Sequence, residues 1–144
     1  VVSVTHSKDE TALNQSFKPD RSDDDGVCLT NAGVIELDEP GSLGNISLPG
    51  MAVFDGTTDS RIVNSRSGLI EVSDGSYASA FGILVGYKVD VEPTLPGSGI
   101  VVDNSGIIVV SDDSDSYGIG YYETDISIFN TGTTQVRHSE DVSY

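Results

Sequence analysis

The fold is decided by the stretch Gly99-Ile100-Val101-Val102-Asp103-Asn104-Ser105-Gly106-Ile107-Ile108-Val109-Val110, which sets two β-branched apolar runs around a short polar segment. β-Branched residues favour strands, and the segment Asp103-Asn104-Ser105-Gly106 carries the polar and glycine residues of a tight turn. This stretch therefore predicts two strands joined as a hairpin. Short apolar runs separated by turn residues continue along the chain in both directions from it.

The same reasoning predicts strands over most of the chain after Gly26. The predicted strands are Val27–Leu29, Gly33–Leu37, Asn45–Leu48, Met51–Phe54, Leu69–Val72, Phe81–Val91, Gly99–Asp103, Gly106–Ser111, Tyr117–Tyr122, Asp125–Phe129 and Thr133–Arg137. With 16 glycines, 5 prolines and no long helical period, the chain is predicted to be all-β, as a small β-barrel or β-sandwich-like domain. The best candidate for a helical turn is Ser7–Phe17, and no internal repeat is apparent.

Residues 1–26 differ from the rest of the chain, because they are polar and lack a sustained apolar period. Two cations, Lys18 and Arg21, stand there beside a cluster of aspartates. We interpret residues 1–26 as an extended N-terminal arm and residues 27–144 as the β-domain.

The net charge of −16, from 23 acidic and 7 basic residues, argues against nucleic acid or an anionic membrane as partner, since both attract cationic surfaces. Of the acids 16 are aspartates, and only three residues are lysines. This composition is typical of proteins from salt-loving organisms, because molar salt shortens the Debye length to about 3 Å and screens the repulsion. The alternative is an acidic protein from an organism that lives at ordinary salt concentration, or a calcium-binding protein. No apolar run approaches the roughly 20 residues that span a bilayer.

Catalytic groups are scarce in this sequence. Its two histidines, His6 and His138, lie near the ends in polar stretches, where a rigid catalytic pair is not expected. The single cysteine, Cys28, is interpreted as a small buried hydrophobe on the first predicted strand. The chain has no tryptophan to hold a sugar and no glycine loop followed by a helix to hold a phosphate. We therefore expect neither an enzyme nor an organic cofactor.

Calcium binding is the one chemical alternative that the sequence raises. The segment Asp113-Ser114-Asp115-Ser116-Tyr117-Gly118 repeats the alternating acids and glycine that open a calcium loop. The acidic residue that closes such a loop at its twelfth position is missing, because Thr124 occupies that position and Glu123 lies one residue before it. We predict a solvated acidic loop, with a Ca²⁺ site as the alternative. The candidate ligands are Asp112, Asp113 and Asp115.

The middle of the chain resembles the head decoration proteins of tailed viruses, of the kind that staples the lambda head. The resemblance is carried by the entry Leu48-Pro49-Gly50-Met51-Ala52-Val53, the strand Phe81-Gly82-Ile83-Leu84-Val85 and the glycine-led valine runs after Gly99 and Gly106. It covers roughly residues 44–110, and it is a pattern of apolar and turn residues. The extra strand-like runs over 117–144 depart from a minimal decoration protein.

This resemblance implies a structural protein on the outer surface of an icosahedral capsid, bound to the major capsid protein and acting as a homotrimer. Together with the salt-adapted composition, it indicates a virus that infects a halophilic archaeon. The polar arm would lie along the capsid and add a strand to one of its sheets. The arm residues expected to contact the capsid are Phe17, Lys18, Pro19 and Arg21. The alternatives are another virion part, such as a turret, fibre base or tail component, or an extracellular or cell-surface β-sandwich module that binds calcium or glycans.

Overall fold

A computed structural model describes residues 2–13, 18, 26–39, 48–54, 56–74, 79–87, 97–112, 115–122 and 125–138. Within these residues the chain forms β-strands and no helix, so no helix there is long and apolar enough to cross a membrane. The strands are β1 (Val2–His6), β2 (Thr11–Leu13), β3 (Val27–Asn31), β4 (Val34–Glu39), β5 (Leu48–Phe54), β6 (Arg61–Asn64), β7 (Leu69–Asp74), β8 (Ala80–Tyr87), β9 (Ile100–Asn104), β10 (Ile107–Asp112), β11 (Ser116–Tyr121), β12 (Ile126–Asn130) and β13 (Thr133–His138). The prediction of an all-β chain is confirmed.

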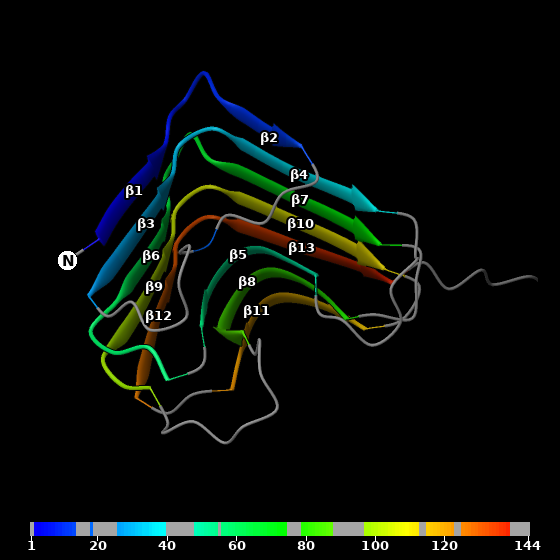
Figure 1. Cartoon of the computed structure of the whole chain (residues 1–144). Helices are drawn as coiled ribbons and strands as arrows, with labels where there is room; N and C mark the ends of the chain where they lie inside the picture. The colour runs from blue at the N-terminus through cyan, green and yellow to red at the C-terminus, as the bar shows by residue number, and fades with distance from the viewer. Residues whose placement is uncertain are drawn as a thin grey trace, which may run out of the picture.

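The strands form three sheets, and every strand pair is parallel (Figure 1). Sheet A has the order β1-β3-β6-β9-β12, sheet B has the order β13-β10-β7-β4-β2, and sheet C has the order β11-β8-β5. The chain passes from sheet A to sheet B to sheet C and then returns to sheet A one layer further on, so each circuit stacks on the last. This architecture is a parallel β-helix, a solenoid of stacked coils, and its sheets do not close into a barrel.

The hairpin predicted at Asp103–Gly106 is wrong. The strands on its two sides, β9 and β10, belong to different sheets and do not pair with each other. Instead β9 lies between β6 and β12, and β10 lies between β7 and β13. The polar segment forms a corner between two sheets, because the side chain of Asn104 points inward to neighbouring coils and bonds Asn64 and Asn130.

The chain does contain an internal repeat, so that expectation was also wrong. After the first coil, each described corner between sheets A and B begins with an asparagine. These residues form a hydrogen-bonded column that we call the asparagine ladder: Asn31, Asn64 and Asn104, which are buried, and Asn130, which is exposed. The separations of 33, 40 and 26 residues (31 to 64, 64 to 104, 104 to 130) differ because the loops between coils differ in length. A comparison at one fixed period therefore misses the repeat.

Glycine follows each ladder asparagine because the coils approach closely at this corner. A Cβ atom on Gly106 would overlap the backbone carbonyl oxygens of Gly68 and Ser65 and come within 2.7 Å of Nδ2 of Asn64. A Cβ atom on Gly132 would likewise overlap the backbone of Gly106. Only a residue without a side chain fits between coils that are also joined by the hydrogen bond from Ile107 N to the Gly68 oxygen, 2.9 Å.

A second stacked corner leads into sheet A, and it uses the left-handed backbone region. Asp59 (φ 50°), Gly99 (φ 68°) and Asp125 (φ 60°) occupy equivalent places in successive coils. Aspartate tolerates this region better than most residues with a side chain, because its short polar side chain bonds nearby backbone. Here Gly99 N donates to Oδ2 of Asp125 at 3.2 Å, which ties this corner to the next coil.

The core runs along the inside of the coils, where each strand places alternate side chains. Position by position these side chains stack from coil to coil, as Ile35, Ile70 and Ile108 do in sheet B, all with no exposed surface. The buried core residues are Val27, Leu29, Ile35, Leu37, Met51, Val53, Ile62, Ile70, Val72, Ala80, Ile83, Val85, Ile100, Val102, Ile108 and Val110. Burial of this continuous column is the main stabilising term of the fold.

The segment 1–26, interpreted from the sequence as an extended arm, includes two of the strands described here. In this segment β1 pairs with β3 and β2 pairs with β4, so both add to sheet edges. His6 takes the ladder position of this coil: Nε2 bonds the Val34 oxygen at 3.0 Å, and Nδ1 lies 3.3 Å from Glu10. The helical turn predicted at Ser7–Phe17 is wrong over its described part, because Thr11–Leu13 is a strand.

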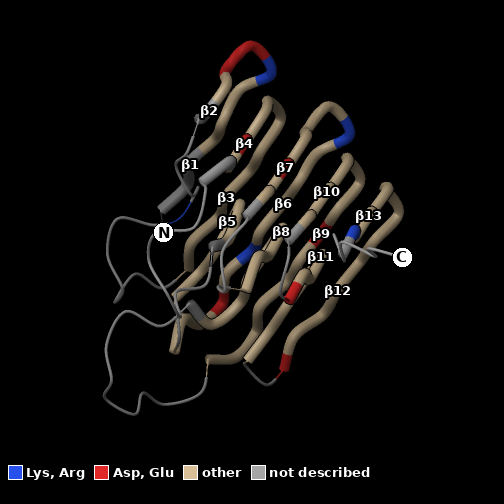
Figure 2. Tube along the Cα trace, turned by 90° about the vertical axis from the view of Figure 1, so that its right-hand side faces the viewer, with Lys and Arg blue, Asp and Glu red and all other residues tan. Residues whose placement is uncertain are grey.

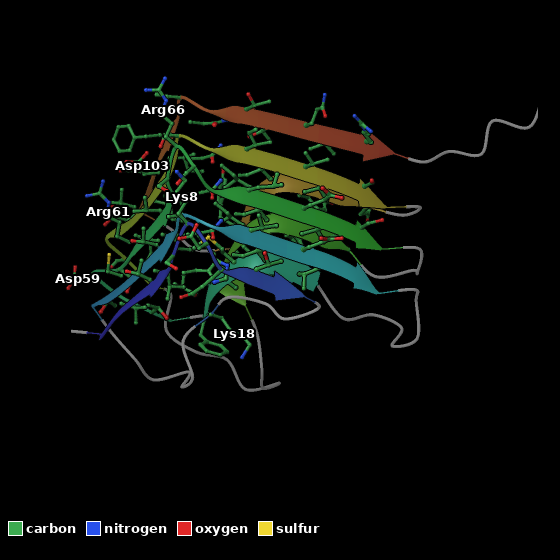
Figure 3. All side chains as sticks on the ribbon, turned by 90° about the horizontal axis from the view of Figure 1, so that it is seen from above. Lys8, Lys18, Asp59, Arg61, Arg66 and Asp103 are labelled. Carbon is green, nitrogen blue, oxygen red and sulfur yellow. The ribbon has the colours of Figure 1, made fainter. Side chains whose placement is uncertain are left out.

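Charged residues of the described chain lie both at the corners and on the strands, although most strand positions carry none (Figure 2). On the outer side of sheet A, Arg61 of β6 and Asp103 of β9 form an ion pair at 3.1 Å (Figure 3). Both side chains are partly exposed, so this pair contributes about 0–1 kcal/mol. The strands thus carry part of the acidic charge of the chain, as Glu36 of β4 and Glu71 of β7 do in register with each other in sheet B.

Candidate binding surface at the end of the β-helix

Sheet C differs from the other two sheets, because its strands β5 and β8 are buried on both faces. The described side chains of Pro49–Phe54 and Ala80–Gly86 are all buried. On the outer face Ala52, Phe81 and Leu84 form an apolar cluster separate from the core. A strand buried on both faces reads as a continuous apolar run, which explains why the sequence of β8 shows no alternation.

Exposed large apolar side chains concentrate in the last strand of each sheet. On or directly after β11 they are Tyr117, Tyr121 and Tyr122, with exposed fractions of 44%, 59% and 63%. The other two last strands add Ile128, Phe129 and Val136, and Ile107 is the exposed side chain outside this group. Scattered apolar side chains are ordinary on protein surfaces, but a group at one end of a solenoid indicates a contact surface.

Part of this region is hollowed into a cavity of about 270 Å³, which we call the aromatic pocket. The residues that line it are Phe81, Tyr117, Ile119, Gly120, Tyr121 and Tyr122. The ring of Phe81 stacks on Tyr117, with centroids 4.9 Å apart and planes 14° apart. The same ring meets Tyr122 edge to face at 6.4 Å. Both arrangements are favourable for aromatic rings, so the pocket wall is fixed by its own side chains.

Strand register positions these rings. Parallel pairing of β8 with β11 sets Tyr117 opposite Phe81, and Tyr122 N donates to the Val85 oxygen at 3.0 Å. Gly120 leaves the room that the Phe81 ring occupies, because a Cβ atom there would come within 2.5 Å of its Cδ1 and Cε1 atoms.

We expect Gly120→Ala to displace the Phe81 ring and to destabilise the protein by about 1 kcal/mol, since the ring can move where backbone could not. Near-ultraviolet circular dichroism should show a changed tyrosine signal, and urea denaturation should give the free energy of unfolding. Ser127→Ala, an exposed position on β12, is the control and should change neither. An unchanged tyrosine signal in Gly120→Ala would contradict the described packing.

The structure places the candidate calcium ligands at the corner between sheets B and C, and describes them only in part. Asp112 is the last residue of β10, and Asp115 is exposed directly before β11. Asp113 and the side chain of Asp112 lie outside the described residues. Within the described part of the chain no three acids, histidines or cysteines are grouped as a metal site. The calcium alternative stays a prediction.

Of the four predicted capsid contacts in the arm, only Lys18 is described; Phe17, Pro19 and Arg21 lie outside the described residues. The Lys18 side chain is half-buried, and its Nζ lies 5.3 Å from the centroid of the Phe54 ring, on β5 of sheet C. Figure 3 shows Lys18 at the side of the molecule away from Arg66. This distance is that of a cation–π interaction.

The sequence analysis missed the aromatic pocket. Its signal was the segment Tyr117-Gly118-Ile119-Gly120-Tyr121-Tyr122, where three tyrosines and two glycines lie within six residues. Phe81 could not be assigned to this site in advance, because its contact with Tyr117 depends on the pairing of β8 with β11.

No protein-family model, curated protein or solved structure matches this chain. The structure therefore defines the chain by its architecture, as a parallel β-helix. Two glycines quoted for the resemblance to head decoration proteins, Gly50 and Gly82, have a place in this architecture. They stack at a bend of sheet C, where a Cβ atom on Gly82 would overlap Cγ2 of Ile108 and come within 2.6 Å of the Gly118 oxygen.

Proposed function

We propose that this chain is a non-enzymatic structural module that binds a partner protein through the open end of its β-helix, formed by β12 and β13. The observation that carries the proposal is a pair of inward positions. Ile128 lies in register with Val102, and Val136 lies in register with Val110. The two valines are fully buried, whereas Ile128 is 40% and Val136 is 47% exposed. The same positions that form the core elsewhere are thus left half-covered here.

The partner that fits this end is a protein that supplies an extended strand. In the described residues β12 and β13 are the last strands in the order of sheets A and B. The backbone of such edges offers hydrogen-bonding groups to a further strand, and the half-covered side chains supply apolar contact. An added strand with apolar residues at alternate positions would cover Ile128 or Val136 as β12 covers Val102 and β13 covers Val110.

We propose the outer surface of a viral capsid as the setting, with the major capsid protein as partner and a homotrimer as the working form. The sequence resemblance to head decoration proteins supports this setting, and so does the acidic, lysine-poor composition expected of a virus with a halophilic host. Turrets, fibre bases and tail components, or a cell-surface module, are the other settings in which a β-helix could dock by its end.

The test uses Ile128→Thr and Val136→Thr, which replace the half-covered apolar side chains by polar ones of similar or smaller size. The control is Ile107→Thr, because Ile107 is 47% exposed like Val136 but lies within sheet B, between β7 and β13. Binding to purified expanded capsids should be measured by co-sedimentation in molar potassium chloride, after circular dichroism has shown each variant folded. We expect each end variant to bind at least about tenfold more weakly, as loss of apolar contact and burial of a hydroxyl predict. Equal binding by all three variants, or no binding by the parent protein, would refute the proposal.

The salt dependence of thermal stability tests separately the proposal that the protein comes from a virus of a halophilic host. The charge of −16 makes the folded chain repel itself, and screening by molar salt should relieve this repulsion. We therefore expect Tm to rise markedly between dilute buffer and molar potassium chloride in thermal melts. A Tm independent of salt would show that the acidic composition is not an adaptation to salt.

A further inference from the structure

The aromatic pocket has a lining without charge inside a strongly acidic protein. Its six lining residues comprise four aromatic rings, one isoleucine and one glycine. The Phe81 ring is 2% exposed and forms the inner wall, whereas Tyr117 and Tyr122 are 44% and 63% exposed and form the outer walls. As far as its described lining goes, the pocket therefore presents aromatic and aliphatic side chains to a ligand and no ion-pairing group.

The outer face of the same sheet already holds a cation against a ring. At the β5 side Lys18 Nζ lies 5.3 Å from the Phe54 centroid, inside the roughly 6 Å range of cation–π attraction. At the β11 side the six pocket residues include no lysine or arginine, so its rings are not matched by a cation from the pocket itself. A cation–π interaction like that of Lys18 with Phe54 at the β5 side of sheet C is thus open to a ligand cation at the β11 side.

The charge of the protein and the size of the pocket limit the chemical class of ligand that it can bind. A net charge of −16 favours cations over anions as ligands, most strongly at low salt. A cavity of about 270 Å³ lies just below the roughly 300–1,000 Å³ of pockets for drug-sized ligands, so the ligand group is small. A primary ammonium is strongly hydrated, and the described residues that line the pocket include no carboxylate to replace that water. A methylated ammonium carries the charge with an apolar surface, which suits ring walls.

We propose that the aromatic pocket binds a small organic cation through its quaternary ammonium group, with Tyr117 and Tyr122 as the principal walls. This site is lined by residues of β8 and β11 and by Tyr122, and none of its lining residues belongs to β12 or β13, which carry the proposed docking. It is therefore independent of the proposed function, and either can fail alone.

The test is a titration of the full chain with choline, followed by isothermal calorimetry and by the tyrosine signals in NMR. The matched probe is 3,3-dimethylbutan-1-ol, which has the same shape and no charge. We expect saturable binding of choline and at least about tenfold weaker binding of the alcohol. Equal affinity for both would leave an apolar cavity without cation recognition and overturn the proposal, as would no binding of choline.

Two variants locate the site. Tyr117→Leu and Tyr122→Leu keep apolar bulk but remove a ring, and each should weaken choline binding by roughly two- to fivefold, the range of one exposed cation–π contact. Phe129→Leu is the control, because Phe129 is a 58% exposed ring on β12 outside the pocket lining. Near-ultraviolet circular dichroism checks that the variants keep their packing. Choline binding unchanged in both tyrosine variants would overturn the assignment to this pocket.

Discussion

Asn64→Ala is expected to destabilise the protein by about 3 kcal/mol, because it interrupts the asparagine ladder at its centre. Asn64 is fully buried; its Oδ1 accepts from Asn31 Nδ2 at 2.9 Å, and its Nδ2 donates to Asn104 Oδ1 at 2.8 Å. Alanine leaves a buried donor on one neighbour and a buried acceptor on the other, and each unsatisfied group costs about 1–3 kcal/mol. Alanine also leaves a space that the stacked coils cannot close by moving together.

The free energy of unfolding should be measured by urea denaturation, with circular dichroism as the probe. Asn130→Ala is the matched control, since this residue ends the ladder, is exposed and donates to Thr134 Oγ1 at 3.1 Å. Its Oδ1 also accepts from Asn104 Nδ2 at 2.8 Å, but because Asn130 is exposed, its removal lets water reach that donor. Its loss should therefore cost less than about 1 kcal/mol. Similar losses for the two variants would mean that the ladder does not hold the coils together.

Gly106→Ala is expected to cost about 3 kcal/mol, the second of the two large effects. The new Cβ atom would overlap two backbone oxygens, those of Gly68 and Ser65, and a backbone cannot rotate away as a side chain can. Relief requires the two coils to separate at this corner. That movement stretches the bonds from Ile107 N to the Gly68 oxygen, 2.9 Å, and from Gly106 N to the Asn64 oxygen, 3.2 Å.

Thr131→Ala serves as the control for this corner, because Thr131 stands next to Gly132 in the last coil with an exposed side chain. Its substitution should change the free energy of unfolding by less than about 0.5 kcal/mol. Both variants can be compared with the parent by urea denaturation under one salt condition. A Gly106→Ala protein as stable as the parent would be incompatible with the close approach of coils at this corner.

The sequence after Gly26 predicts most of the segments that form strands. Three strands of the whole described chain were missed. The missed strands are β1, β2 and β6. In β6 only Ile62 and Val63 separate Arg61 from Asn64, which is too short an apolar run to recognise. Its stability comes from neighbours on both sides, since β6 pairs with β3 and β9. A strand held by two partners needs little propensity of its own.

The binding surface was less predictable than the strands. Tyr117 and Tyr122 could be noted as tyrosines beside glycines, but their exposure depends on where β11 lies in sheet C. Val102 and Ile128 look alike in the sequence, yet one is buried and the other 40% exposed because their coils differ in position. Local sequence carries no mark of being last in a stack.

The sequence by itself determined that the chain is all-β, which residues form most of its strands, and that the stretch 99–110 holds two of them around a polar corner. Alternation of apolar residues carries this information, since it depends only on near neighbours along the chain. The tertiary structure alone decided that β9 and β10 turn into separate sheets and pair with other coils. A segment of the form Asp-Asn-Ser-Gly can form the turn of a hairpin or the corner of a solenoid. Here it forms a corner, because the Asn104 side chain hydrogen-bonds Asn64 and Asn130, which lie 40 and 26 positions away in the sequence.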